Sequence, residues 1–137
     1  MIKIRFEDFE NANYNDDKED YKIYLVRNAN GEILYVGISR TSVWNRWFGN
    51  FGRMQRAYNG EFIPSDSVSN EIYINLPLSL NWTIELLTVR DGYDIISDEW
   101  RYPDIPIGDN YKTHWINEIE KLMIKKLKPK LNYTYNA

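Results

Sequence analysis

Glu120 is the residue whose position in this chain points most directly to chemistry. It belongs to residues 114–127, where apolar side chains recur with helical spacing and which Thr113 can cap. At about 100° per residue, Glu120 falls at the edge of the apolar stripe, between Ile124 and Leu127. A carboxylate there costs free energy unless it is hydrogen-bonded, paired or bound to a metal. The stripe consists of Trp115, Ile116, Ile119, Leu122, Met123 and Leu127.

Two interpretations of Glu120 stay open at this level. In the first, the carboxylate is a ligand of a divalent cation, because hard cations prefer oxygen donors. In the second, Glu120 is a boundary residue of the helix whose carboxylate reaches water or pairs with an arginine. Glu118, by contrast, lies on the polar face near Lys121 and needs no special explanation.

Two basic segments stand out in a chain whose net charge is −3. Residues 40–56 and residues 121–130 carry several cations and no acid, while the acids gather in residues 7–20 and 91–109. If the fold joins the basic segments, they form a patch that can contact phosphates. The alternative is a solvated helix face and a solvated tail. The cations are Arg40, Arg46, Arg53, Arg56, Lys121, Lys125, Lys126, Lys128 and Lys130.

The elements that must position these residues alternate between strands and helices. Period-two or β-branched patterns predict strands at 2–6, 21–26, 33–38 and 82–89, with residues 28–31 forming an Asn-Gly hairpin turn. Helices are expected over 43–48, 53–58 and 114–127, a polar linker over 11–20, and long loops over 59–70 and 90–112. We therefore predict an α+β fold, with a small antiparallel sheet of about three central strands flanked by helices. The N-terminal strand would extend the edge of this sheet.

Composition narrows the class of protein. The 137 residues are 43% hydrophobic and 15% aromatic, which favours one folded domain. The absence of cysteine excludes disulfides and Cys-ligated zinc. No apolar run reaches the roughly 20 residues that span a bilayer, and residues 1–10 lack the apolar region of a signal peptide. The expectation is a cytoplasmic protein without a membrane partner, with a strand and acidic linker at 1–20 and a single domain at 21–137.

Four segments, taken in order, resemble the GIY-YIG nucleases. Lys22-Ile23-Tyr24 and Tyr35-Val36-Gly37 are similar to the two strand motifs that name the family, and they flank the Asn-Gly turn. Arg46 matches the arginine of the helix that follows, and residues 82–89 match the third strand. The chain from Glu120 through Lys128-Pro129 to Leu131-Asn132 matches the closing Glu-x-x-Leu…Pro-x-Leu-Asn pattern. The resemblance covers about residues 21–132.

The resemblance implies a metal-dependent endonuclease that hydrolyses phosphodiester bonds in DNA and leaves a 5′-phosphate and a 3′-hydroxyl. Glu120 would be the only protein ligand of one Mg²⁺ or Mn²⁺ ion. Tyr24 or Tyr35 would orient or deprotonate the attacking water, and Arg46 would hold the phosphate through its guanidinium fork. Asn132 would support the tyrosine or the phosphate. Arg40, Arg53, Arg56, Lys125 and Lys128 are the expected additional contacts to nucleic acid.

Each of these residues also has an ordinary structural interpretation. The two tyrosines can be cross-strand aromatics, Arg46 a surface cation, and Asn132 part of a C-terminal turn. The chain also departs from the family, since Lys22 replaces a glycine, Ile38 stands where repair-type members often carry lysine, and Asn50 stands where many carry histidine. These departures motivate an alternative, a catalytically degenerate module that binds nucleic acid or a protein partner without cleavage.

A second alternative is an unrelated α+β interaction protein whose acidic segments, 7–20 and 91–109, meet a basic partner. If Tyr24, Tyr35, Arg46 and Glu120 do not converge on one concave surface, both the nuclease and the degenerate module fail. The specificity of a nuclease would come from residues 59–80 and 90–112, from self-association, or from a targeting protein. The abundance of Asn, Tyr and Ile is typical of an AT-rich genome, such as that of a phage or mobile element.

Overall fold

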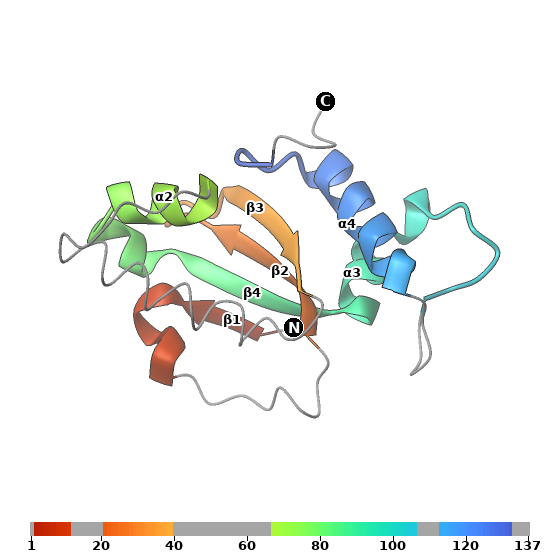
Figure 1. The fold of residues 1–137 in the computed structure, drawn as a ribbon, viewed down its shortest axis with the longest axis horizontal. Coiled ribbons are helices and arrows are strands. Elements are labelled where there is room, and N and C mark those ends of the chain that lie inside the picture. The colour runs from red at the N-terminus through yellow and green to blue at the C-terminus, as the bar shows by residue number, and fades with distance from the viewer. Residues whose placement is uncertain (1, 12–20, 40–66, 107–112, 133–137) are drawn as a thin grey trace.

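A four-stranded antiparallel sheet and three helices make up the part of the chain that the computed structural model describes, residues 2–11, 21–39, 67–106 and 113–132 (Figure 1). The strand order is β1-β4-β2-β3, with β1 at Ile2–Arg5, β2 at Tyr21–Arg27, β3 at Ile33–Ile38 and β4 at Thr83–Thr88. The predicted α+β class is therefore confirmed. As expected, β1 extends the edge of the sheet, beside β4.

The hairpin of β2 and β3 forms around the predicted Asn-Gly turn. Gly31 adopts a φ of 82°, in the left-handed region that glycine tolerates without strain. The side-chain oxygen of Asn28 accepts hydrogen bonds from the backbone N–H groups of Asn30 and Glu32, each at 3.0 Å. These bonds fix the turn and hence the register, which pairs Tyr24 with Gly37 and Val26 with Tyr35.

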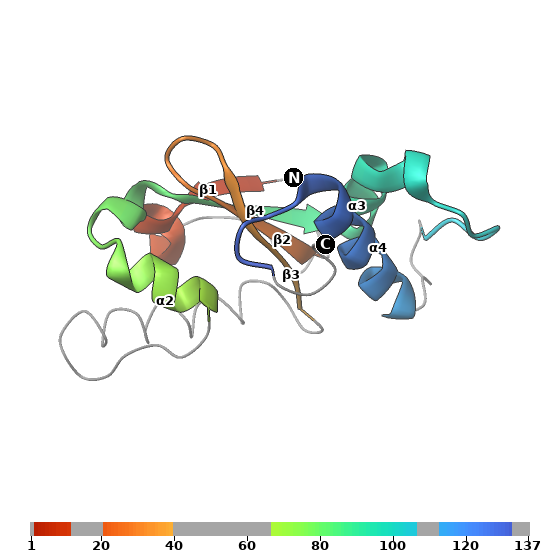
Figure 2. The same ribbon diagram turned by 90° about the horizontal axis from the view of Figure 1, so that it is seen from above.

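The two faces of the sheet pack against different helices. On one face, Tyr24 and Val26 join a buried cluster that includes Ile72 of α2 (Ser67–Ile74). On the other face, Ile23 and Leu25 pack against α3 (Val89–Ile96) and α4 (Thr113–Leu127). Figure 2 shows α3 and α4 together at one end of the sheet and α2 at the other. No helix within the described ranges is both long enough and apolar enough to cross a bilayer.

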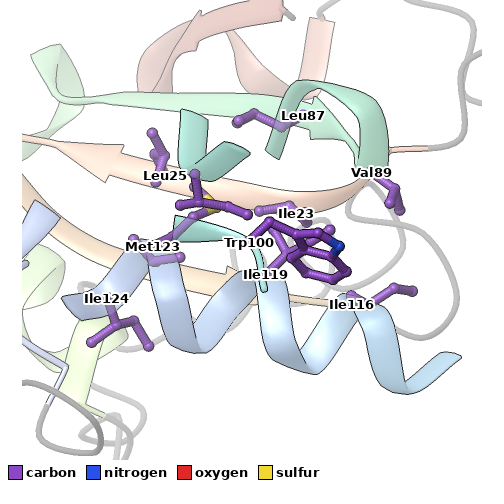
Figure 3. Close-up of a cluster of buried hydrophobic side chains, with 11 residues drawn as sticks. Ile23, Leu25, Leu87, Val89, Trp100, Ile116, Ile119, Met123 and Ile124 are labelled. Carbon is purple, nitrogen blue, oxygen red and sulfur yellow. The ribbon is translucent and has the colours of Figure 1, made fainter. Parts of the chain in front are cut away.

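Helix α4 buries the face that its periodicity predicts, with one addition. Figure 3 shows Ile119 and Met123 pointing from α4 toward the side chains of β2, and Ile116 is buried in the same cluster. Ile124 leaves the helix on another side and is buried as well. The buried face of α4 therefore extends beyond Glu120. Glu120 itself is half-buried, one helical turn from Ile116 and one turn from Ile124.

Helix α3 was not expected, because residues 90–112 were predicted to be a surface insertion. Thr88 ends β4 and caps the helix, accepting a hydrogen bond from the Asp91 backbone N–H at 3.1 Å. The Asp91 carboxylate accepts one from the Thr88 N–H at 3.0 Å, which completes a capping box. Val89 and Ile96, one helical repeat of seven apart, are buried. The Asp91-Gly92 pair is typical of a turn, and it masked this pattern.

Several other boundaries differ from the prediction. Helix α2 was not predicted at all, and its first residues, 67–70, were expected in a loop. The strand predicted over 2–6 ends at Arg5 because Phe6–Asn11 forms a 3-10 helix, η1. Two further 3-10 turns, η2 (Leu78–Asn81) and η3 (Ser97–Glu99), lie in the stretches 59–80 and 90–112 to which specificity was assigned. The helices predicted over 43–48 and 53–58 lie outside the described residues.

Candidate active site

Tyr24 and Tyr35 form a stacked pair on one face of the hairpin. Their ring centroids are 6.0 Å apart and their planes differ by 28°. Tyr35 lies opposite Val26 in the β2–β3 register, so it is the diagonal neighbour of Tyr24 on the same face. Tyr24 is buried, with 1% of its surface exposed, whereas Tyr35 is half-buried. Of the two rings, Tyr35 is the one with more access to water.

Gly37 provides the space in which the Tyr24 ring lies. A Cβ atom at Gly37 would stand 2.3 Å from both Cζ and the hydroxyl oxygen of Tyr24, far inside van der Waals contact. The phenol end of Tyr24 therefore rests directly on the backbone of the edge strand β3 at Gly37. The Tyr24 ring, at the end of the first motif, therefore explains why the second motif ends in glycine, Gly37.

Asn132 holds the strand that carries Tyr35. Its side-chain oxygen accepts a hydrogen bond from the Val36 N–H at 2.8 Å, and its amide group donates one to the Val36 carbonyl at 2.9 Å. The Leu131 N–H also donates to the Leu34 carbonyl, at 2.7 Å. The chain after α4 thus pairs with the free edge of β3. Asn132 acts here as a positioning residue, since both bonds fix the peptide groups between Tyr35 and Gly37.

The connection from α4 to this edge is a short, tightly turned segment. Lys128 has a φ of 50°, and its N–H donates to the Ile124 carbonyl at 2.9 Å, which ends the helix. Pro129 is buried and prevents the helix from continuing. The closing motif of the sequence is therefore the segment that joins the helix of Glu120 to the strand of Tyr35.

The tyrosine pair and the helix that carries Glu120 pack on opposite faces of the sheet. The Tyr24 ring lies in the cluster beneath α2, while α4 packs against β2 and β3 on the other face. Strand β3, which carries Tyr35, therefore has α4 on one face and the two tyrosine rings on the other. Arg46 lies outside the described residues. Of the four residues expected to converge, the described part of the chain brings Tyr24 and Tyr35 together.

Among the described residues, Glu120 is the one carboxylate that the resemblance assigns to a metal ion. No group of three or more acidic, histidine or cysteine side chains with metal-binding geometry occurs within the described ranges. A single half-buried glutamate fits a hydrated hard cation such as Mg²⁺, which keeps several waters and completes its shell with substrate phosphate. It does not fit zinc, whose structural and catalytic sites need three or four protein ligands.

The lysines after Glu120 divide into paired and unpaired groups. Lys126 contacts Asp98 at 2.7 Å and the Ile95 carbonyl at 2.8 Å, and it lowers the pKa of the Asp98 carboxyl by hydrogen bonding. Lys130 pairs with Glu32 and likewise lowers its pKa. Lys125 and Lys128 are exposed, and neither has an ion pair with any residue that the structure describes.

The remaining cations expected to contact nucleic acid, Arg40, Arg53 and Arg56, lie outside the described ranges, as does Arg46. Of the five additional cations expected to contact nucleic acid, Lys125 and Lys128 are the two that lie in the described ranges. Both lie at the C-terminal end of α4, where the helix turns toward the edge of β3. Cations at that end of a helix also complement its dipole.

A buried carboxylate in β4 was not anticipated. Glu85 is almost fully buried, and its Oε1 lies 2.7 Å from Nε of Arg27 and 3.5 Å from Nζ of Lys3. The three residues come from β4, β2 and β1, so the charges join three strands of the sheet. The sequence places Glu85 within a predicted strand, but no local signal shows that its cationic partners lie on neighbouring strands.

Comparisons with known proteins give no relative for this chain. No protein-family model matches it. No curated protein matches it significantly, and no solved structure does so either. The likeness to the GIY-YIG nucleases consequently rests on the motifs of the sequence.

Proposed function

We propose that this protein is a metal-dependent endonuclease of the GIY-YIG type that hydrolyses phosphodiester bonds in DNA. The observation that carries the proposal is the tyrosine pair on the hairpin, with the Tyr24 ring seated on Gly37 and stacked against Tyr35. The closing motif supports it further, because Asn132 binds the peptide groups next to Tyr35. Two motifs nearly a hundred residues apart in sequence thus meet at one strand edge.

In this proposal the two tyrosines have different tasks. Tyr35 is half-buried and orients the attacking water or accepts its proton. An unperturbed tyrosine has a pKa of about 10, so Tyr35 needs a nearby cation to act as a base at neutral pH. Tyr24 is buried and holds the Tyr35 ring in place. Arg46 would clamp the scissile phosphate through its bidentate guanidinium.

Glu120 would hold one Mg²⁺ or Mn²⁺ ion. Such an ion, when bound, supplies a water of lowered pKa and charge stabilisation on the phosphoryl oxygens. The half-buried position of Glu120 between Ile116 and Ile124 limits the rotamers of its side chain, so the carboxylate is held in place rather than free in solvent. Lys125 and Lys128 are available to contact the flanking phosphates.

The second candidate is a degenerate GIY-YIG module that binds nucleic acid or a protein partner without cutting. The observation that favours it is Asn50, which stands where many members of the family carry a histidine. Lys22 and Ile38, which replace motif residues of the family, favour it too. It predicts a folded protein that binds nucleic acid with no turnover.

An assay with several substrates separates the two candidates. The protein is incubated with supercoiled plasmid and with branched and single-stranded oligonucleotides, in Mg²⁺, in Mn²⁺ and in EDTA. The nuclease predicts metal-dependent products with a 5′-phosphate, and an about 10²-fold or greater loss of rate in Tyr35→Phe. Tyr73→Phe, a half-buried tyrosine of α2, is the matched control and should cut normally. Binding without products on every substrate would establish the degenerate module instead.

A further inference from the structure

A cluster of four aromatic rings covers the end of the α3–α4 pair that lies away from the β3 edge. Trp100 is its centre, with ring centroids 5.8 Å from Tyr93, 5.1 Å from Tyr102 and 5.3 Å from Trp115. Tyr102 and Trp115 also contact each other, at 4.7 Å. Trp100 is 8% exposed and packs into the core beside Ile116 (Figure 3). The cluster therefore joins the loop after α3 to the first turns of α4.

The loop that carries Tyr102 is closed by its own hydrogen bonds. The indole N–H of Trp100 donates to the Asp104 carbonyl at 2.9 Å, and Arg101 donates to the Asp98 carbonyl at 2.8 Å. A loop held in this way loses little further conformational entropy when a partner binds. Yet Tyr102 remains 41% exposed and Ile105 52% exposed. The loop thus presents a fixed aromatic and aliphatic surface to solvent.

Acidic residues lie on α4 and in the loop near this surface. The Tyr102 hydroxyl donates to Glu118 of α4, and this hydrogen bond raises the pKa of Tyr102 above its ordinary value. Asp104 and Glu99 are exposed in the loop. Residues 89–106 contain five acidic and two basic side chains. Arg90 pairs with Asp94 at 3.3 Å and Arg101 donates to backbone carbonyls, and with two bases against five acids the segment keeps a net charge of −3.

We propose that the surface formed by Tyr102, Trp115, Glu118, Asp104 and Ile105 binds an arginine side chain of a partner protein. A guanidinium group stacks on aromatic rings and donates bidentate hydrogen bonds to a carboxylate, and this surface offers both within one contact. Exposed aromatic side chains are also the residues that dominate binding energy at protein interfaces. Ile105 would add apolar contact around the buried cation.

Charge decides between this occupant and nucleic acid. Unpaired bases also stack on exposed aromatic rings, but their backbone then requires cations that neutralise its phosphates. Here Glu118 lies beside Tyr102, and residues 89–106 carry a net charge of −3 with Arg101 included, which disfavours phosphate. A cationic protein segment gains from the same carboxylates.

The proposed arginine-binding surface lies at the N-terminal end of α4, so a partner protein and nucleic acid could bind the two ends of this helix at the same time. Trp115 lies in the first turn of α4, and the exposed Lys125 is ten residues later, about 15 Å along the helix axis. The protein-binding surface and the basic end therefore do not compete for space. The arginine-binding surface does not depend on nuclease activity and holds equally for a degenerate module.

The test is a titration followed by NMR of the tryptophan indole N–H signals. The probe is a short peptide with two arginines beside a leucine, and the control probe is the same peptide with neutral citrulline for arginine. The arginine peptide should shift the signals of Trp100 and Trp115 but not that of Trp82, with a Kd on the order of 1 mM. Tyr102→Ala and Glu118→Gln should each weaken binding about fivefold or more. Tyr73→Ala and Glu71→Gln on α2 should not.

The remaining outcomes decide against the proposal. Equal binding of the citrulline peptide would show that charge plays no part, and no shift with either peptide would remove the surface as a peptide site. A shift caused by oligothymidylate would identify a nucleic-acid surface. A shift that follows protein concentration alone would identify a self-association surface. Glu118→Gln tests the charge even if Tyr102→Ala disturbs the loop, because the isosteric change leaves all four rings in place.

Discussion

The tyrosine edge of the sheet and the aromatic loop after α3 use the same kind of side chain in opposite ways. At the edge, Tyr24 is buried against Gly37 and stacked on Tyr35, and the partners come from distant parts of the chain. In the loop, Tyr102 is exposed and its ring partners lie within a few residues or on the adjacent helix. The first arrangement fixes the position of a hydroxyl-bearing ring, and the second displays a ring to a partner.

The largest loss of stability should come from Gly37→Ala, which disrupts the packing of Tyr24 against β3. The new methyl group would overlap the Tyr24 ring, and the strand or the ring must move. We expect a loss of about 3 kcal/mol of unfolding free energy, measured by urea denaturation, together with displaced Tyr24 and Tyr35 NMR signals. Gly31→Ala is the control, because its Cβ meets nothing within 4 Å and costs only its left-handed backbone. If both variants leave the tyrosine signals unchanged, the ring does not lie on Gly37.

Asn132→Ala should follow in size. It removes both hydrogen bonds to Val36 and leaves a buried N–H and a buried carbonyl without this partner. The expected loss is about 2 kcal/mol, seen by urea denaturation, with faster amide exchange at Val36. Asn132→Asp keeps the acceptor for the Val36 N–H but sets a carboxylate against the Val36 carbonyl, so it should not restore stability. Unchanged exchange at Val36 in both variants would contradict the anchoring role.

Thr88→Ala tests the end of the molecule that carries the aromatic loop, because Thr88 caps α3. It removes the capping bond to the Asp91 N–H and should destabilise the protein by about 1 kcal/mol. The exchange of α3 amides should rise, because α3 supports the aromatic loop, while the β2–β3 amides near Tyr24 keep their protection. Thr83→Ala at the start of β4 is the comparison, since Thr83 caps no helix. Equal loosening of both ends would show that the two regions do not act separately.

Glu118→Gln should have the smallest effect, confined to the titration of Tyr102. The hydrogen bond to the Glu118 carboxylate raises the pKa of Tyr102, because it favours the protonated phenol, and burial adds to the shift. Removing the negative charge should lower this pKa toward its ordinary value, as followed by the Tyr102 ring signals at alkaline pH. Stability near neutral pH should stay unchanged. A Tyr102 pKa that does not move would place Glu118 outside the aromatic surface.

Local signals in the sequence account for the parts of the fold that were predicted. The Asn28–Gly31 turn between two apolar segments specifies the hairpin, and the periodicity from Trp115 to Leu127 specifies α4. Helix α3 was missed because Asp91-Gly92 has the composition of a turn, although the Thr88–Asp91 capping box was present. Helix α2 was missed altogether, since three of its first four residues are polar.

The candidate site was predictable in its residues but not in its contacts. The motifs identified Tyr24, Tyr35 and Asn132, yet the seat of the Tyr24 ring on Gly37 depends on the β2–β3 register. The bonds from Asn132 to Val36 join residues 96 positions apart, which no local pattern encodes. The cations around Glu85 and the ring contacts of Trp100 arise in the same way, from packing between elements.

The rate of DNA cleavage by Glu120→Gln, compared with the wild-type protein in Mg²⁺, tests the central claim most directly. The substitution keeps the shape of the half-buried side chain and removes only its charge, so both proteins should unfold at similar temperatures. Glu71→Gln, a half-buried glutamate of α2, is the matched control. We predict an about 10²-fold or greater loss of cleavage in Glu120→Gln and wild-type rates in the control. Equal cleavage by all three proteins would contradict Glu120 as the metal ligand and, with it, the proposed mechanism.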